Sequence, residues 1–182
     1  MKVLIIVDMQ KDFIDGALGT SEAAAITDKV AERIAAGHNE LVLFTQDTHD
    51  DDYLNTPEGK KLPVVHCVKG TEGWEINPSI KAAWKNHPNT IIIPALPENT
   101  FTKPVFGSVD LVKFLADRQN EIESIEILGI CTDICVISNA IMIKNTLPHI
   151  NISVNAALCA GVTPQSHQAA LDVMKMCHID IV

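Results

Sequence analysis

The sequence predicts an α/β protein, a three-layer α/β/α fold with a central, mostly parallel six-stranded sheet. Three observations lead to this prediction. Short aliphatic runs alternate with helix-like segments, which is typical of βα units. The runs are apolar enough for strands that are buried on both faces, as parallel strands are. The 182 residues show no internal repeat and no interdomain linker, so we expect residues 1–182 to form a single domain.

The predicted elements alternate along the chain. We expect strands near residues 2–7, 41–46, 90–94, 124–129, 150–155 and 179–182, and helices near residues 22–36, 108–119, 132–145 and 164–176. Ser21 is the expected N-cap of the first helix, and Gly37 follows its last residue. Pro164, directly after Thr163, suits the first turn of the last helix.

Residues 47–84 show no strong periodicity and contain several prolines and glycines, so we expect an irregular loop region there. Loops of this length inside compact domains are usually functional or disordered. His49, His66 and Trp74 argue against disorder in this one. The segment is therefore a candidate for ligand binding.

Composition excludes several classes of partner. The net charge of −9, without a Lys/Arg cluster, argues against nucleic acids and anionic membranes. Because no run of 18 or more uncharged apolar residues exists, we expect no transmembrane helix. The five cysteines are an odd number without the spacing of a disulfide scaffold, which favours a reducing, cytoplasmic location.

Reactive side chains follow four of the predicted strands. Asp8 comes directly after the first strand, and Asp47 and His49 come after the second. Lys103 lies a few residues beyond the third, and Cys135 lies just past the fourth. Alone, each has an ordinary structural explanation, such as a capping carboxylate or a solvated amine. Since ligand sites in parallel sheets gather beyond the carboxyl ends of the strands, their joint placement predicts a catalytic edge.

Cys135 is the candidate nucleophile because a strand ends at Gly129 and a helix begins soon after it. A thiol at a helix N-terminus lies near the positive end of the dipole, which favours the thiolate. The free backbone N–H groups there can also stabilise an oxyanion. Taken alone, a cysteine with apolar neighbours is more often an inert core residue.

A second group of residues has the character of a metal site. Asp47 and His49 are two apart on an extended segment and so point the same way, and His66 returns from the loop region. Two imidazoles and a carboxylate suit Zn²⁺, Fe²⁺ or Mn²⁺. Glu58 lies between them in sequence. The alternative is a hydrogen-bonded polar cluster without an ion.

Together these segments resemble the isochorismatase-like cysteine hydrolases, and within them the nicotinamidase/pyrazinamidase group. The matching motifs span nearly the whole chain in the family's order: Val7-Asp8-Met9-Gln10, Thr45-Gln46-Asp47-Thr48-His49, His66-Cys67-Val68-Lys69-Gly70-Thr71, Lys103-Pro104-Val105-Phe106 and Thr132-Asp133-Ile134-Cys135-Val136. The last motif is specific for the superfamily. The Asp-x-His pair with the His-Cys-Val segment favours the nicotinamidases.

The resemblance implies a catalytic triad of Asp8, Lys103 and Cys135, with the backbone amides of Cys131 and Cys135 as the oxyanion hole. In the family the peptide bond before the Cys131 position is cis. Lys103 is expected to keep Asp8 poised and to lower the pKa of Cys135.

The resemblance also implies a divalent metal ion, with zinc favoured over iron or manganese. Asp47, His49 and His66 would be its ligands, with Glu58 as an additional one. The expected activity is hydrolysis of nicotinamide to nicotinate and ammonia, and also of pyrazinamide, through a cysteine thioester. The ring nitrogen is expected on the metal or on a metal-bound water.

Three aromatic residues, Phe13, Trp74 and Phe106, are candidate walls for the substrate ring, although each could equally be ordinary core. We expect a small-molecule amide as the only ligand partner besides the metal, and a homo-oligomer, either a dimer or a tetramer.

Two other functions stay open at this point. One is a related cysteine hydrolase with another small amide or a carbamoyl amide as its substrate. An isochorismatase needs no cysteine, so the intact set of Asp8, Lys103 and Cys135 weighs against that reaction. The other is a non-catalytic metal-binding or scaffold domain, which should show no preferential alkylation of Cys135.

Overall fold

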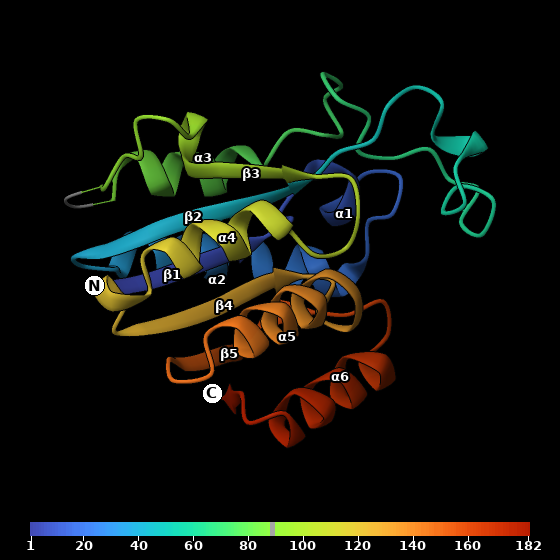
Figure 1. Ribbon diagram of the computed structural model, residues 1–182. Coiled ribbons are helices and arrows are strands. Elements are labelled where there is room, and N and C mark those ends of the chain that lie inside the picture. Colours follow the sequence, from blue (N-terminus) through green and yellow to red (C-terminus); the bar gives the residue numbers. More distant parts are fainter. Residues whose placement is uncertain (88–89) are drawn as a thin grey trace.

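The computed structural model describes residues 1–87 and 90–182. Figure 1 shows a central sheet with helices on both of its faces, as the α/β prediction requires. The strand order is β3-β2-β1-β4-β5-β6, and all neighbouring strands are parallel. The strands are β1 (Lys2–Val7), β2 (Glu40–Asp47), β3 (Thr100–Lys103), β4 (Ser124–Ile130), β5 (Asn151–Ala160) and β6 (Asp180–Ile181).

The helices divide between the two faces. In one group, α1 and α3 pack against α2, and in the other, α4 and α6 pack against α5 (Figure 1). The first group is α1 (Lys11–Ile14), α2 (Ser21–Ala36) and α3 (Pro78–Lys85), and the second is α4 (Val109–Asp117), α5 (Ile137–Thr146) and α6 (Pro164–Met176). None of the helices in the described ranges combines the length and the apolar character that crossing a bilayer requires.

The strand expected at residues 90–94 is wrong, because that stretch is irregular and the edge strand is β3. The cause is Asn99, which is fully buried. Its side-chain amide donates to the carbonyls of Val42 and Ile91, and its Oδ1 accepts from the N–H of Ile93. These bonds occupy backbone groups that a strand would pair. Lys103 is consequently the last residue of β3 and does not lie beyond a strand.

Of three helix starts that the sequence predicts, one is confirmed and two differ in the structure. The N-cap of α2 is Thr20 and not Ser21, since the Thr20 hydroxyl accepts from the N–H of Ala23 at 3.0 Å. Thr163 caps α6 with Pro164 at its start, which confirms that prediction. The expected helix 132–145 opens instead with a π-helical turn, Thr132–Val136, before α5.

The region 47–84 is largely irregular, but it contains a 3₁₀ turn (Tyr53–Asn55) and most of α3. Figure 1 shows this segment extending past the carboxyl ends of β2 and β3. Those ends are level with each other and with their neighbours, because Val7 pairs with Thr45 and with Gly129 while Asp47 pairs with Lys103. Side chains at the four exits therefore meet above one edge of the sheet.

Gly129 permits the close approach of β4 to β1, and we expect Gly129→Ala to destabilise the fold by about 2 kcal/mol or more. Its φ is +122°, and an added Cβ would lie 2.2 Å from the carbonyl oxygen of Val7. Urea unfolding measures the loss. Gly70→Ala is the matched control, because Gly70 has a φ of +82° but nothing within 4 Å of its added Cβ. That variant should lose only about 1 kcal/mol, and equal losses would contradict the argument.

Candidate active site

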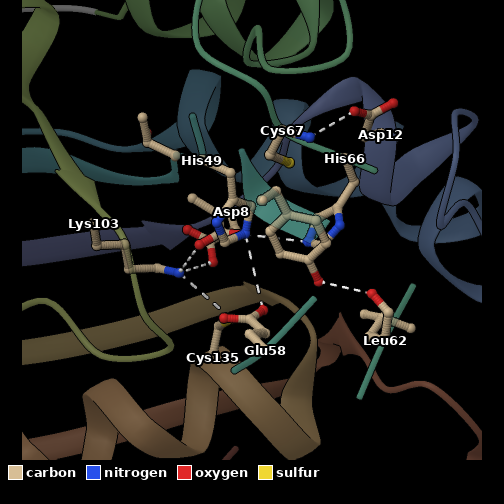
Figure 2. A network of polar contacts seen from close by, with 12 residues as sticks. Asp8, Asp12, His49, Glu58, Leu62, His66, Cys67, Lys103 and Cys135 are labelled. Atoms are coloured by element: carbon tan, nitrogen blue, oxygen red, sulfur yellow. Dashed lines mark hydrogen bonds and ion pairs between the residues drawn. The ribbon is translucent and has the colours of Figure 1, made fainter. Parts of the chain in front are cut away.

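Asp8, Lys103 and Cys135 come together in one buried cluster. Nζ of Lys103 lies 2.7 Å from Oδ2 of Asp8 and 3.5 Å from Sγ of Cys135. The side chains are almost free of solvent, with Asp8 0%, Lys103 1% and Cys135 6% exposed. Oδ1 of Asp8 accepts a hydrogen bond from Thr45 at 2.7 Å. In Figure 2, dashed lines mark the contacts that Lys103 makes in this cluster.

The charges in this cluster differ from the expectation for Cys135. Burial raises the pKa of the Cys135 thiol well above its ordinary value, the Asp8 charge raises it further, and Lys103 offsets only part of this. Burial lowers the pKa of Lys103, but the nearby anionic groups, Asp8 foremost, outweigh burial and hold that pKa above its ordinary value. The resting state therefore pairs an ammonium with a neutral thiol. Lys103 does lower the pKa of Cys135, as expected, but burial and the Asp8 charge outweigh it, so the net shift of the thiol pKa is upward.

Asp8 is suited to remove the thiol proton. Burial raises the pKa of its carboxyl group, and the ion pair with Lys103 counteracts this only in part. A carboxylate with a raised pKa is a stronger base than an exposed one. The roles of Cys135 as nucleophile and of Asp8 as its base stay predictions, which this arrangement would suit.

The turn that carries Cys135 has unusual backbone geometry. The Ile130–Cys131 peptide bond is cis, as the resemblance implied. The π-helical turn follows, with the N–H of Val136 donating to the carbonyl of Cys131 at 3.0 Å. No side chain caps this turn. The assignment of the Cys131 and Cys135 amides as the oxyanion hole stays a prediction.

A cavity of about 310 Å³ opens beside the cluster. Its walls are almost entirely apolar and include both Cys131 and Cys135. Phe13 and Phe106 line it, as expected for ring-packing walls. Trp74 is not among the described residues around it. Its indole N–H donates to Thr48, and its ring lines a separate cavity near β3. Trp74 thus lies away from the cavity beside Cys135, and its contact with a substrate stays a prediction.

Sequence reasoning missed most of the remaining wall. These residues come from the segment before α2, the loop region, the nucleophile turn and the loop after β5: Leu18, Thr20, Leu62, Ile134 and Val162. Four of them are aliphatic, and nothing in the sequence distinguishes an aliphatic cavity wall from ordinary core.

A candidate metal site adjoins the cavity. One ligand atom each from Asp47, His49 and His66 lies within 4.8 Å of the others, and all three residues are buried. Oδ2 of Asp47 is 3.0 Å from Nε2 of His49 and 3.6 Å from Nε2 of His66. Nε2 of His49 is buried and makes no hydrogen bond with the described residues. A buried nitrogen without such a partner, facing a carboxylate, fits a divalent ion between them.

The surrounding residues orient these ligands. Nδ1 of His66 hydrogen bonds to the carbonyl of Val64 at 2.8 Å, which leaves Nε2 for the ion. Tyr53 packs against both imidazoles, with ring centroids 4.5 Å and 4.9 Å away. Glu58 lies 3.9 Å from Nε2 of His49 (Figure 2), and its role as an additional ligand stays a prediction.

Gln10 is a buried positioning residue that sequence reasoning did not single out. Its Oε1 accepts from the N–H of Asp47 at 2.7 Å, and its Nε2 donates to the Asp47 carbonyl at 2.8 Å. Asp47 in turn lies 3.2 Å from Nζ of Lys103 through Oδ1. The candidate metal site and the cluster of Asp8, Lys103 and Cys135 are therefore in direct contact. Gln10 stands in the Asp8 motif, which is the one signal that could have indicated it.

The isochorismatase domain matches residues 2–181 of this sequence. The chain belongs to the isochorismatase family. This family member is 31% identical to the nicotinamidase/pyrazinamidase of Mycobacterium tuberculosis (strain ATCC 25618 / H37Rv) over 198 aligned residues, with 100% of this chain and 98% of the relative covered. The match confirms the family predicted from the motifs.

Solved structures of related proteins have the same fold. Pyrazinamidase of Pyrococcus horikoshii in complex with zinc has a TM-score of 0.78 and 27% identity, covering 100% of this chain and 98% of the other. Nicotinamidase PncA of Bacillus subtilis has a TM-score of 0.82 and 27% identity over the same shares.

Proposed function

We propose that this isochorismatase-family enzyme is an amidohydrolase that converts nicotinamide to nicotinate and ammonia, and that also accepts pyrazinamide. The observation that carries the proposal is the buried cluster of Asp8, Lys103 and Cys135 at the end of an apolar cavity. The names of the similar proteins from Mycobacterium tuberculosis and Bacillus subtilis support the choice of amide.

The side chains support a two-step reaction. Sγ of Cys135 attacks the carboxamide carbon while its proton passes to Asp8, and the carbonyl electron pair moves onto oxygen. The amides of the nucleophile turn stabilise this oxyanion. Asp8 returns the proton to the leaving nitrogen, so the C–N bond breaks and ammonia leaves a thioester.

Water completes the cycle. Asp8 takes a proton from the water as its oxygen attacks the thioester carbon. The C–S bond then breaks, the acid is released, and the proton on Asp8 restores the Cys135 thiol. Lys103 keeps a positive charge 3.5 Å from the sulfur throughout, which stabilises the thiolate character of both transition states.

The cavity and the metal centre orient the substrate. Apolar walls that include Phe13 and Phe106 suit an uncharged aromatic ring and disfavour the carboxylate product. Asp47, His49 and His66 would hold the ion, which we propose to be zinc, with iron or manganese as alternatives. When bound, the ion supplies a Lewis acid for the lone pair of the ring nitrogen.

A screen of ammonia release tests the substrate. We expect turnover of nicotinamide and pyrazinamide, slower turnover of benzamide, and none of aliphatic carbamoyl amides. Release from the carbamoyl amides alone would favour the related-hydrolase alternative. Absence of release from every amide, together with no preferential alkylation of Cys135, would favour a scaffold domain.

Removal of one imidazole tests the metal centre. We expect His49→Ala to lose the roughly one equivalent of ion found in the parent protein, and to raise the KM for nicotinamide by about 10- to 100-fold. Benzamide lacks the ring nitrogen and should be affected far less. Elemental analysis and steady-state kinetics give both results. His149→Ala, at an exposed histidine, is the control. Full amidase activity in protein without stoichiometric metal would contradict the assignment.

Two further properties belong to the proposal. We infer a homo-oligomer, a dimer or a tetramer, and a cytoplasmic location. The apolar surface of Val105, Phe106 and Val109, each about half exposed or more, supports association. Sedimentation velocity and cell fractionation measure these properties.

A further inference from the structure

The turn that carries the nucleophile has no cap of its own. Among the residues that the structure describes, no side chain caps either the π-helical turn Thr132–Val136 or the start of α5 that follows it. Missing caps leave the first N–H groups of a helix without side-chain partners, which is what stabilisation of an oxyanion requires. A turn without a cap needs another means of holding its geometry.

Two contacts from outside the turn supply that hold. Oγ1 of Thr132 is 2.8 Å from Nδ1 of His167, which lies on α6. The carboxylate of Asp133, the next residue, accepts from the N–H of Val162 at 3.1 and 3.2 Å. The hydroxyl-bearing Thr132 is fully buried. The structure thus ties two successive residues of the turn to the segment that runs from β5 into α6.

The fit around His167 is tight. A Cβ added to Gly161 would lie 2.9 Å from the Cβ of His167, so the loop after β5 packs directly on the start of α6. The backbone and Cβ of His167 are therefore held close to Gly161, and its ring contacts Thr132 from that position.

We propose that His167 is a positioning residue: through Thr132 it holds the nucleophile turn so that its amides face the reacting carbonyl. His167 is not among the described residues that line the cavity, so it acts through the turn and not on the substrate. The inference rests on the proposed function, because it assigns the turn to oxyanion stabilisation. Its effect belongs to the transition state and not to ground-state binding.

The test compares four variants with the parent holoenzyme. His167→Ala removes the ring, and His167→Asn keeps a polar atom near the Nδ1 position. Thr132→Val removes the partner, and a fourth variant combines it with His167→Ala. Gln168→Ala, at the exposed neighbour on α6, is the control.

We expect His167→Ala to lower kcat for nicotinamide about 10- to 100-fold with KM within twofold, since small misplacements of a catalytic group have effects of this size. Thr132→Val should match it, the double variant should be no worse than either single, and His167→Asn should recover most of the loss. Pyridine-3-carbaldehyde adds a second readout, because Sγ adds to its carbonyl carbon and the thiol proton goes to oxygen. His167→Ala should weaken binding of this aldehyde by the same factor and leave nicotinate binding unchanged.

Three outcomes would overturn the proposal: kcat within twofold of the parent in His167→Ala, equal weakening of aldehyde and nicotinate, or additive losses in the double variant. Hydrogen exchange of the turn separates this failure from failure of the proposed function. If the parent protein releases no ammonia from nicotinamide, the function is wrong. Faster amide hydrogen exchange in the turn of His167→Ala and Thr132→Val, but not of Gln168→Ala, would still support positioning of the turn by His167. Unchanged exchange would refute it.

Discussion

Replacing Cys135 by alanine should abolish hydrolysis, with kcat lower by roughly 10⁴-fold or more, and should leave the protein folded. The thioester forms on Sγ, which lies 3.5 Å from Nζ of Lys103 at the end of the cavity. No neighbouring group can replace it. Ammonia release measures the loss of activity, and circular dichroism with thermal melting measures the fold.

Cys131→Ala is the matched control, because both cysteines line the same cavity. The proposed role of Cys131 belongs to its backbone amide, so this variant should keep most of the activity. Burial raises the pKa of both thiols, to about 12 for Cys131, so the difference between them lies in the contact of Cys135 with Lys103 at 3.5 Å. Interchangeable effects of the two substitutions would show that the nucleophile is misassigned.

Lys103→Met should lose both activity and stability. The variant leaves the carboxylates of Asp8 and Asp47 buried without the ammonium that lies 2.7 and 3.2 Å from them. Breaking a buried pair in this way costs about 3–5 kcal/mol of unfolding free energy, or roughly 6–20 °C in Tm for a chain of this size. Calorimetry measures the shift.

The sign of the pH dependence follows from Asp8. Burial already raises its pKa in the parent protein, so its ionisation opposes folding, and stability falls as pH rises through that pKa. Without Lys103 the pKa of Asp8 rises further. The stability deficit of Lys103→Met should therefore be largest near neutral pH and shrink on acidification. A deficit that grows at low pH would contradict this account.

Lys81→Met is the control for removing a lysine. Lys81 also lies between two carboxylates, 3.0 Å from Glu75 and 3.0 Å from Glu98, but its side chain is 27% exposed. Exposed pairs of this kind contribute about 0–1 kcal/mol. Activity should be unchanged in this variant. A loss equal to that of Lys103→Met would mean that burial is not the decisive factor.

The sequence predicts the site best where an apolar strand ends in a polar residue. Asp8 and Cys135 follow, and Asp47 ends, strands that are visible as aliphatic runs, so their common edge could be predicted. Strand β3 could not be predicted, because Thr100–Lys103 is short and polar, whereas residues 91–93 have the composition of a strand. The side-chain bonds of Asn99 decide between the two, and such tertiary contacts leave no local signal.

Two further properties of the site, the pKa of Cys135 and the position of Trp74, also depend on tertiary structure. A thiol near the start of a helix predicts a low pKa for Cys135, yet the surrounding apolar walls raise it. Trp74 was expected at the ring because it is aromatic and lies in the loop region. Its hydrogen bond to Thr48 directs it elsewhere. Sequence spacing reveals neither the burial of Cys135 nor the hydrogen bond of Trp74.

The short edge strand has a consequence for the behaviour of the protein in solution. Strand β3 has four residues, pairs with β2, and ends in Lys103, whose ammonium reaches across β2 to Asp8 beyond β1. If β3 detaches, residues Phe44 to Asp47 of β2 lose the strand that they pair with and become an open edge, which is a template for pairing with other chains. The lysine that serves catalysis thereby also guards against aggregation. Loss of the contact between Lys103 and Asp8 would then have two results, an inactive site and a protein that aggregates.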